Sequence, residues 1–156
     1  MKIENIKRGA LVTGAARRIG RAIALGLAKD GWHVVVHYHQ SSEAAEQTVA
    51  AIEAQGGQAT AIAADLSKAE SASQLITDSI SVTGGLTCLV NNASLFVNDS
   101  ISSFNTEGFN SIMSVNLCTP ILLSRAFSEK LPEAANGVII NLLDQKLVNP
   151  NPDFLS

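Results

Sequence analysis

The stretch Thr13-Gly14-Ala15-Ala16-Arg17-Arg18-Ile19-Gly20 decides the fold, because it joins a short apolar strand to an amphipathic helix. The strand is Ala10-Leu11-Val12, and from Ile19 onward apolar or small residues recur at helical spacing. A glycine turn between a strand and a helix directs free backbone N–H groups and the helix N-terminus toward a phosphate. Gly14 permits the tight turn, and Gly20 permits close packing of the backbone or helix.

Strands and helices alternate along the rest of the chain. Further strands are expected at residues 33–39, 59–63, 86–90 and 138–143, and helices at 42–55 and along an apolar stripe from Phe109 to Ser124. Ser67, followed three residues later by Glu70, predicts a capping box that opens another helix. This alternation predicts an α/β, doubly wound parallel sheet of the Rossmann-like type, with five strands. The continuous apolar runs predict strands buried on both faces, the run at 138–143 included.

Length and composition exclude several other classes of protein. A chain of 156 residues with 46% apolar and 16% charged residues suits one globular domain rather than a disordered chain or a coiled coil. No apolar run reaches the roughly 18 residues of a membrane span, and the first residues do not form a signal peptide. Cys88 and Cys118 lie in apolar segments, which predicts buried free thiols in a reducing compartment. We therefore expect a cytoplasmic protein without membrane contact.

Charge is distributed unevenly along the chain. Residues 1–40 contain seven Lys or Arg and two acidic residues, whereas residues 41–156 contain four basic and twelve acidic residues. A local basic cluster in an otherwise acidic chain indicates a small anion as the ligand, not a nucleic acid.

The end of the second expected strand indicates which anion binds. An acidic residue there usually holds the ribose 2′-OH of NAD, but this stretch reads His37-Tyr38-His39-Gln40-Ser41-Ser42, with no carboxylate before Glu43. With Arg17 and Arg18 nearby, this favours NADP(H) over NAD(H). The alternative is that the arginines are only solvated and that the two histidines merely share one face of a strand. No metal site is predicted, since two histidines lack a further ligand at metal-binding spacing.

These motifs together resemble the short-chain dehydrogenases/reductases. Asp65-Leu66 matches the family's adenine-contacting position, Asn91-Asn92-Ala93 its Asn-Asn-Ala motif, and Asn116 its helix asparagine. Arg18, in place of the usual middle glycine, and the stretch at 37–39 resemble the pteridine reductases most closely. The residues and the resemblance together assign cofactor binding to Gly14, Arg17, Arg18, Ile19, Gly20, His37, Tyr38, His39, Ser41, Asp65, Leu66, Asn92 and Ala93.

Asn116 is the first candidate catalytic residue. It falls on the expected buried stripe of its helix, and Pro120, four residues later, has no N–H to bond the Asn116 carbonyl. A bend there would leave this carbonyl free to hold a water molecule. The resemblance implies the same role, a water anchored by this asparagine in a proton relay. The alternative is a kinked helix that only packs.

Asp144 is the second candidate catalytic residue, and Ser94 and Phe96 are candidates for the substrate pocket. Asp144 follows the fifth expected strand where most of the superfamily has serine and the pteridine reductases have aspartate. The resemblance implies that it binds the amino-pyrimidine edge of a pterin or helps to deliver a proton. Ser94 and Phe96 match residues that line the pterin slot, and a phenylalanine offers a flat face to a planar ring. Alternatively, Asp144 is a loop or cap residue and Phe96 is part of the core.

The resemblance implies NADPH-dependent hydride transfer to a pterin or dihydrofolate-like ring. Reduction of a ketone, such as a 3-oxoacyl thioester or a sugar, is the alternative within the superfamily. A non-catalytic NADP(H)-binding module that senses redox state is the alternative from another class. The resemblance also implies a homotetramer assembled through the helix near residues 108–130.

The family's catalytic tyrosine and lysine have no counterpart in this sequence. Its only tyrosine is Tyr38, Lys146 comes too early, and by the family's spacing the tyrosine would follow directly after Ser156. We therefore expect residues 1–156 to form a single, incomplete NADP-binding domain of a longer reductase, inactive by itself, whose fifth strand is an exposed apolar edge. A natural short pseudoenzyme is the alternative.

Overall fold

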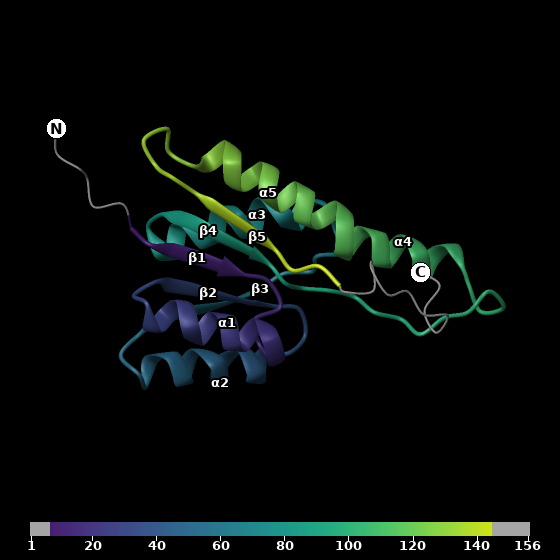
Figure 1. Ribbon diagram of the computed structural model, residues 1–156, viewed down its shortest axis with the longest axis horizontal. Helices are drawn as coiled ribbons and strands as arrows, with labels where there is room; N and C mark the ends of the chain where they lie inside the picture. The colour runs from purple at the N-terminus through teal and green to yellow at the C-terminus, as the bar shows by residue number, and fades with distance from the viewer. Residues whose placement is uncertain (1–6, 145–156) are drawn as a thin grey trace.

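The computed structural model describes residues 7–144, which form a five-stranded parallel sheet in the order β3-β2-β1-β4-β5 (Figure 1). Lys146 and Ser156 lie outside these described residues. The strands are Gly9–Val12 (β1), His33–Tyr38 (β2), Gln58–Ala63 (β3), Leu86–Asn91 (β4) and Val138–Asn141 (β5). The helices are Arg18–Lys29 (α1), Ser42–Glu53 (α2), Glu70–Thr83 (α3), Thr106–Met113 (α4) and Thr119–Lys130 (α5), with a π-helical turn at Ser114–Cys118. The predicted Rossmann-like α/β fold is confirmed.

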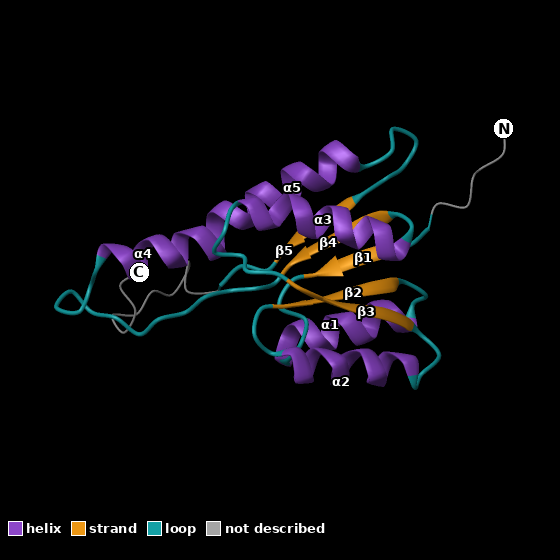
Figure 2. Ribbon diagram, turned by 180° about the vertical axis from the view of Figure 1, so that it is seen from behind, coloured by secondary structure: helices purple, strands orange, loops and turns teal. Residues whose placement is uncertain are grey.

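The sheet separates two helical layers (Figure 2). Helices α1 and α2 cover one face, where Val34 and Val36 of β2 contribute to one apolar cluster. Helices α3 and α5 cover the other face, where Leu11 and Val35 contribute to a second cluster. Because successive side chains of a strand point to opposite faces, a strand covered on both sides carries apolar residues at successive positions, as Ala10-Leu11-Val12 of β1 and Val34-Val35-Val36 of β2 do. Among the described residues, no helix is long and apolar enough to cross a membrane.

Strand β5 differs from the other strands. It pairs with β4 only, and all four of its residues are exposed, including Val138, Ile139 and Ile140. The prediction that this run is buried on both faces is therefore wrong, whereas the expected exposed apolar edge is confirmed. Within the described residues, β3 and β5 are the two edge strands of the sheet, so one row of backbone groups of β5 lacks a neighbouring strand.

Two local predictions are wrong. Ser67 does not cap α3, since the helix begins at Glu70 after Ala69 and has no side-chain cap, while the Ser67 hydroxyl donates to the Asp65 carboxylate. The acceptor two residues earlier is nearer than the helix, so the hydroxyl bonds it instead. Of the two thiols, Cys88 is buried but Cys118 is exposed.

The expected buried stripe from Phe109 to Ser124 is also wrong in most of its length. Ile112 is buried, but Asn116 is exposed, and the buried residues of α5 lie on a different face, with Leu123 and Phe127 among them. The exposed apolar residues of this helical stretch are Phe109, Met113, Leu117 and Ile121. Periodicity failed here because apolar residues occupy two faces, and only one face packs on the sheet. A π-helical turn at Ser114–Cys118 precedes Pro120, and the expected bend at this proline stays a prediction.

Candidate functional site

The residues predicted for the site lie at or beside the carboxyl ends of the strands, which form one end of the sheet. All four pairings between neighbouring strands are parallel, so their carboxyl ends meet there. The order β3-β2-β1-β4-β5 changes direction between β1 and β4, and in open α/β sheets ligands bind in the crevice at such a switch point. The glycine turn follows β1, and Asn92 and Ala93 follow β4 on the opposite side of this crevice.

The two glycines of the turn are required by geometry. Gly14 has a φ of 64°, in the left-handed region, and a Cβ there would lie 3.0 Å from the Ala93 Cα atom. A Cβ on Gly20 would collide with the Gly14 carbonyl oxygen and would lie 2.5 Å from the Asn92 amide nitrogen. The turn therefore folds back on the start of α1 and packs against the residues that follow β4.

Thr13 joins the ends of β1 and β4. Its hydroxyl donates to the Val90 carbonyl (3.3 Å) and accepts the backbone N–H groups of Asn92 (2.9 Å) and Ala93 (3.0 Å). The Asn92 side-chain amide in turn donates to the carbonyls of Thr13 (2.8 Å) and Gly14 (3.2 Å). These bonds fix the glycine turn against β4. No role was predicted for Thr13 from the sequence, although a threonine between an apolar strand and a glycine turn could have indicated a hydroxyl that bonds backbone groups there.

Two hollows flank Arg17. One, of about 310 Å³, is lined by Gly14, Ala16, Arg17, Tyr38, His39, Gln40 and Ser41. The other, of about 440 Å³, is lined by Ala16, Arg17, Arg18, Arg21, Glu43, Ala44 and Gln47. Arg18 is the one described non-glycine residue with a positive φ, 52°. A side chain in this conformation costs about 1 kcal/mol, and such strain collects at functional sites.

His37 lies beneath the glycine turn and is 2% exposed. Its Nδ1 accepts the Gly14 N–H (3.0 Å), and its Nε2 lies 3.1 Å from the Ala64 carbonyl oxygen. Burial lowers the pKa of His37 to about 4, since a charged imidazole loses its hydration there. His37 is thus a neutral, internal side chain, and its predicted contact with the cofactor stays a prediction.

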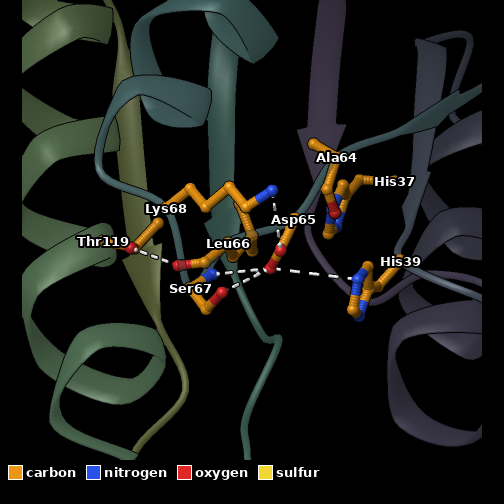
Figure 3. Close-up of polar contacts among 8 residues, drawn as sticks. All are labelled: His37, His39, Ala64, Asp65, Leu66, Ser67, Lys68 and Thr119. Atoms are coloured by element: carbon orange, nitrogen blue, oxygen red, sulfur yellow. Dashed lines mark hydrogen bonds and ion pairs between the residues drawn. The ribbon is translucent and has the colours of Figure 1, made fainter. Parts of the chain in front are cut away.

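Asp65 is the centre of a polar cluster at the end of β3 (Figure 3). Its carboxylate accepts the backbone N–H (3.0 Å) and the hydroxyl (2.7 Å) of Ser67. His39 Nε2 and Lys68 Nζ each lie 3.8 Å from a carboxylate oxygen. The hydrogen bonds from Ser67 lower the pKa of Asp65, so the carboxylate is ionised at neutral pH. Among the described residues, no group of three or more His, Cys, Asp or Glu is arranged to hold a metal.

Asn116 fastens the loop that follows β4 to the π-helical turn. Its side-chain oxygen accepts the Leu95 N–H (2.7 Å), and its amide donates to the Leu95 carbonyl (2.8 Å). One bond is to the backbone N–H of Leu95 and the other to its carbonyl oxygen, so the Asn116 side chain holds this residue at two points. Ser94 and Phe96 flank Leu95 and are exposed, Phe96 to 59%.

Asp144 stands three residues beyond β5 and is exposed. The strand that leads to it is joined to β4 by the side chains of Asn91 and Asn141, which face each other in register (2.8 Å). The Asn91 side-chain oxygen is buried and has no hydrogen-bond partner within the described residues. Sequence reasoning assigned no role to the Asn91–Asn141 pair, whose partners are 50 positions apart.

The sequence profile of the family described as short chain dehydrogenase matches residues 8–154. The chain belongs to this family. Its match covers the glycine turn, the Asp65 cluster, Asn116 and Asp144 in one continuous stretch.

Several relatives within the short chain dehydrogenase family are similar over most of this chain. A 3-oxoacyl-[acyl-carrier-protein] reductase of Synechocystis sp. is 38% identical over 143 residues, 92% of this chain and 58% of the relative. The crystal structure of FolM alternative dihydrofolate reductase 1 from Brucella canis, complexed with NADP, is 35% identical with a TM-score of 0.87, over 94% of this chain and 58% of that chain. A short chain dehydrogenase from Burkholderia cenocepacia in complex with NADP is 34% identical with a TM-score of 0.88, over 95% and 60%. The chain thus spans about three-fifths of the length of these relatives.

The residues predicted to bind the cofactor and those predicted to bind the substrate of this short chain dehydrogenase differ in how far the structure brings them together. The residues assigned to the cofactor surround the glycine turn and the ends of β2 and β3, and hydrogen bonds link several of them. Ser94, Phe96 and Asp144, assigned to the substrate, follow β4 and β5, and the three of them are exposed. None of these assignments to a ligand is tested by the fold itself, so each stays a prediction.

Proposed function

We propose that this short chain dehydrogenase is an NADPH-dependent reductase that transfers hydride to a pterin or dihydrofolate-like ring. The main support for this proposal is the hollow of about 310 Å³ lined by Arg17, Tyr38, His39 and Ser41, among others. It lies at the end of β2, and the residues that end this strand include no carboxylate. A cationic guanidinium with hydroxyl and imidazole groups suits the 2′-phosphate that distinguishes NADPH from NADH. The Brucella canis and Burkholderia cenocepacia relatives, both crystallised with NADP, support this choice of cofactor.

The residues present fit a dinucleotide along the whole edge of the sheet. The first turn of α1 presents N–H groups without intrahelical partners, which suit a diphosphate, and Asp65 with the Leu66 backbone would contact the adenine. The cofactor would run from there past Gly14 toward the loop after β4. The nicotinamide supplies the hydride when it is bound, and the protein supplies its orientation.

On the substrate side, Phe96 would pack its ring against a flat heterocycle, and Asp144 would hydrogen-bond a polar edge of that ring. Asn116 would act by holding the Leu95 backbone, which sets the position of Ser94 and Phe96 on either side. The resemblance of the FolM relative, whose name is that of a dihydrofolate reductase, supports a folate-like substrate.

Reduction of a 3-oxoacyl thioester is the second candidate function. It is favoured by the Synechocystis reductase, which is 38% identical to this chain. The sequence differs from a typical ketone reductase at three positions, since Asp144 replaces a serine, Arg18 a glycine, and Phe96 lies in the loop where a planar ring would stack. These three positions favour the pterin or dihydrofolate-like substrate.

The test is turnover by the complete protein with NADPH, with dihydrobiopterin and dihydrofolate in one series and a 3-oxoacyl thioester in the other. We expect reduction of the pterin or folate at a rate that falls at least about tenfold in Asp144→Ser. Brisk ketone reduction without pterin or folate turnover would contradict the proposed substrate. NADPH binding without turnover of any of these substrates would favour the non-catalytic module.

We also propose that the complete protein is a homotetramer joined through residues 108–130. The exposed apolar side chains of Phe109, Met113, Leu117 and Ile121 recur at four-residue spacing on one face, which suits packing against a second helix. Light scattering of the complete protein measures the mass directly. A monomer in solution at micromolar concentration would contradict this assembly.

A further inference from the structure

His37 uses both ring nitrogens inside the protein. Nδ1 accepts the N–H of Gly14, whose φ of 64° places it in the left-handed region, and Nε2 faces the Ala64 carbonyl oxygen after β3. A ring nitrogen that accepts a hydrogen bond carries no proton, so in the neutral ring the proton is on Nε2. The hydrogen bond to Ala64 then has the correct direction, with Nε2–H as the donor.

The backbone of His37 also contacts the same turn. Its carbonyl oxygen accepts the N–H of Ala15 at 2.9 Å, next to the Gly14 N–H that the ring accepts. Two successive N–H groups of the glycine turn are therefore held by His37 and are not available to a phosphate. An anion at this turn must be bound by later groups, those of the first turn of α1 from Arg18 to Gly20.

His37 also connects two parts of the proposed cofactor site. Ala64 accepts from the ring and donates its own N–H to the Tyr38 carbonyl (3.0 Å), and Asp65 with its polar cluster follows directly (Figure 3). The imidazole thus joins the glycine turn after β1 to the segment after β3. The two ring nitrogens, an acceptor on one side and a donor on the other, let one side chain bond both segments.

We propose that His37 is a positioning residue: its Nε2-protonated imidazole holds the Gly14 turn and the Ala64–Asp65 segment in the relative arrangement that NADPH requires. This inference rests on the proposed function, because it assumes that a dinucleotide occupies the carboxyl edge of the sheet. In this role His37 acts through the two segments that it holds. It determines where the first turn of α1 and Asp65 lie, and these two contact the diphosphate and the adenine.

Two substitutions separate the two contacts of the ring. His37→Asn places an amide oxygen near the position of Nδ1 and keeps an acceptor for Gly14, whereas His37→Gln places an amide nitrogen near Nε2 and keeps a donor for Ala64. We expect His37→Gln to weaken NADPH binding about tenfold and His37→Asn by about threefold or less, because the Gly14 turn sets the position of the first turn of α1, which would bind the phosphates. NADPH fluorescence titration measures both, and thermal unfolding confirms that each variant is folded.

His33 provides the matched control. It lies on the same strand at the opposite end, and its Nε2 is 3.0 Å from the Thr60 hydroxyl, so His33→Asn also removes a histidine contact between β2 and β3. We expect this variant to bind NADPH as the unsubstituted protein does. Equal losses in His33→Asn and His37→Gln would show a general effect of weakening β2, and would overturn the proposal.

The protonation of the ring is measured without cofactor. Long-range ¹⁵N–¹H spectra at pH 7 should show His37 as the neutral Nε2–H form, with the Gly14 amide shifted in His37→Gln. An Nδ1–H ring or an imidazolium at this pH would overturn the proposal whether or not NADPH binds. If the unsubstituted protein does not bind NADPH while the ring is in the expected form, the proposed function fails, and His37 is then a structural link without a role toward NADPH.

Discussion

The two halves of the carboxyl edge of the sheet are built differently. At β1, β2 and β3, the Gly14 N–H of the glycine turn donates to the His37 ring, and Thr13 accepts hydrogen bonds from the backbone and the side chain of Asn92. At β4 and β5, the loop that contains Ser94 and Phe96 is held to the helical layer by Asn116, and β5 is exposed along its length. The cofactor half therefore has its geometry fixed by internal contacts, whereas the substrate half depends on few of them. Substitutions in the two halves should differ accordingly.

The largest effect is expected from Thr13→Val, which would break the cofactor half. The substitution keeps the shape of the side chain but leaves the backbone N–H groups of Asn92 and Ala93 without their acceptor, whereas the Val90 carbonyl keeps the Thr13 N–H. Two partly buried donors left unpaired, at about 2 kcal/mol each, lower the free energy of unfolding by about 4 kcal/mol. Urea unfolding measures the loss. Thr13→Ser keeps the hydroxyl and should lose less than half as much, and an equal loss in both variants would show that the methyl group matters instead.

The second effect is a pH dependence that arises from His37. Its pKa is about 4 in the folded protein, against 6.5 for an ordinary histidine, so the unfolded chain takes up a proton at a higher pH than the folded chain. The stability is complete above about pH 6.5 and is lost as the pH falls toward 4, by up to about 3 kcal/mol. Urea unfolding between pH 7 and 4.5 measures this slope.

His37→Asn should remove most of the slope, while His33→Asn should leave most of it. The pKa of His33 is also lowered, by partial burial and by Lys7, so His33 adds a smaller loss in the same direction. A slope unchanged in His37→Asn would show that other groups cause the acid sensitivity. His37 would then not account for the acid sensitivity of the cofactor half.

A smaller effect is expected in the substrate half from Asn116→Ala. The two hydrogen bonds to Leu95 are exposed, so their loss should cost about 1 kcal/mol of stability. The larger consequence is local, since amide hydrogen exchange in residues 94–104 should become faster than in the glycine turn. Asn110→Ala, at an exposed position on α4, is the matched control and should change neither quantity. Equal exchange rates in the two halves before substitution would contradict the comparison.

The smallest effect is expected from Arg18→Gly, which should stabilise the protein. Arg18 has a φ of 52°, and glycine adopts this conformation without the cost of about 1 kcal/mol that a side chain incurs. Both Arg18→Gly and Arg18→Ala remove the guanidinium and should reduce the preference for NADPH over NADH, but only the glycine variant relieves the strain. Thermal unfolding and titration with the two cofactors separate the effects. A glycine variant less stable than the alanine variant would contradict this account.

The same division explains how much could be predicted from the sequence. The strands, the parallel sheet and the glycine turn followed from local patterns, because β1 and the start of α1 are separated only by residues 13–17. The Asn91–Asn141 pair and the Asn116–Leu95 contacts join residues that are 50 and 21 positions apart, and no local pattern indicates them. The buried face of α5 was missed because apolar residues occur on two faces, and packing on the sheet decides between them.

The wrong predictions have similar causes. Ser67 has the spacing of a capping box, but the Asp65 carboxylate two residues earlier competes for its hydroxyl. Cys118 has apolar neighbours in sequence, but it lies in the π-helical turn, which has no buried residue. Both outcomes depend on the three-dimensional surroundings of the residue: the acceptor nearest to the Ser67 hydroxyl, and the exposure of the turn that contains Cys118. Composition and spacing do not contain that information.

The hydrogen bonds between Thr13 and Asn92 have a consequence for the order in which the protein forms during synthesis. The two residues are 79 positions apart, which at about 5–20 residues per second corresponds to on the order of 4 to 16 s on the ribosome. By the end of that interval the nascent chain contains the glycine turn, α1, β2 and β3, but until Asn92 is made it lacks the strand end that fixes the turn. The proposed dinucleotide site is therefore completed only with β4, and a cofactor bound there would select chains in which the first 92 residues have folded together.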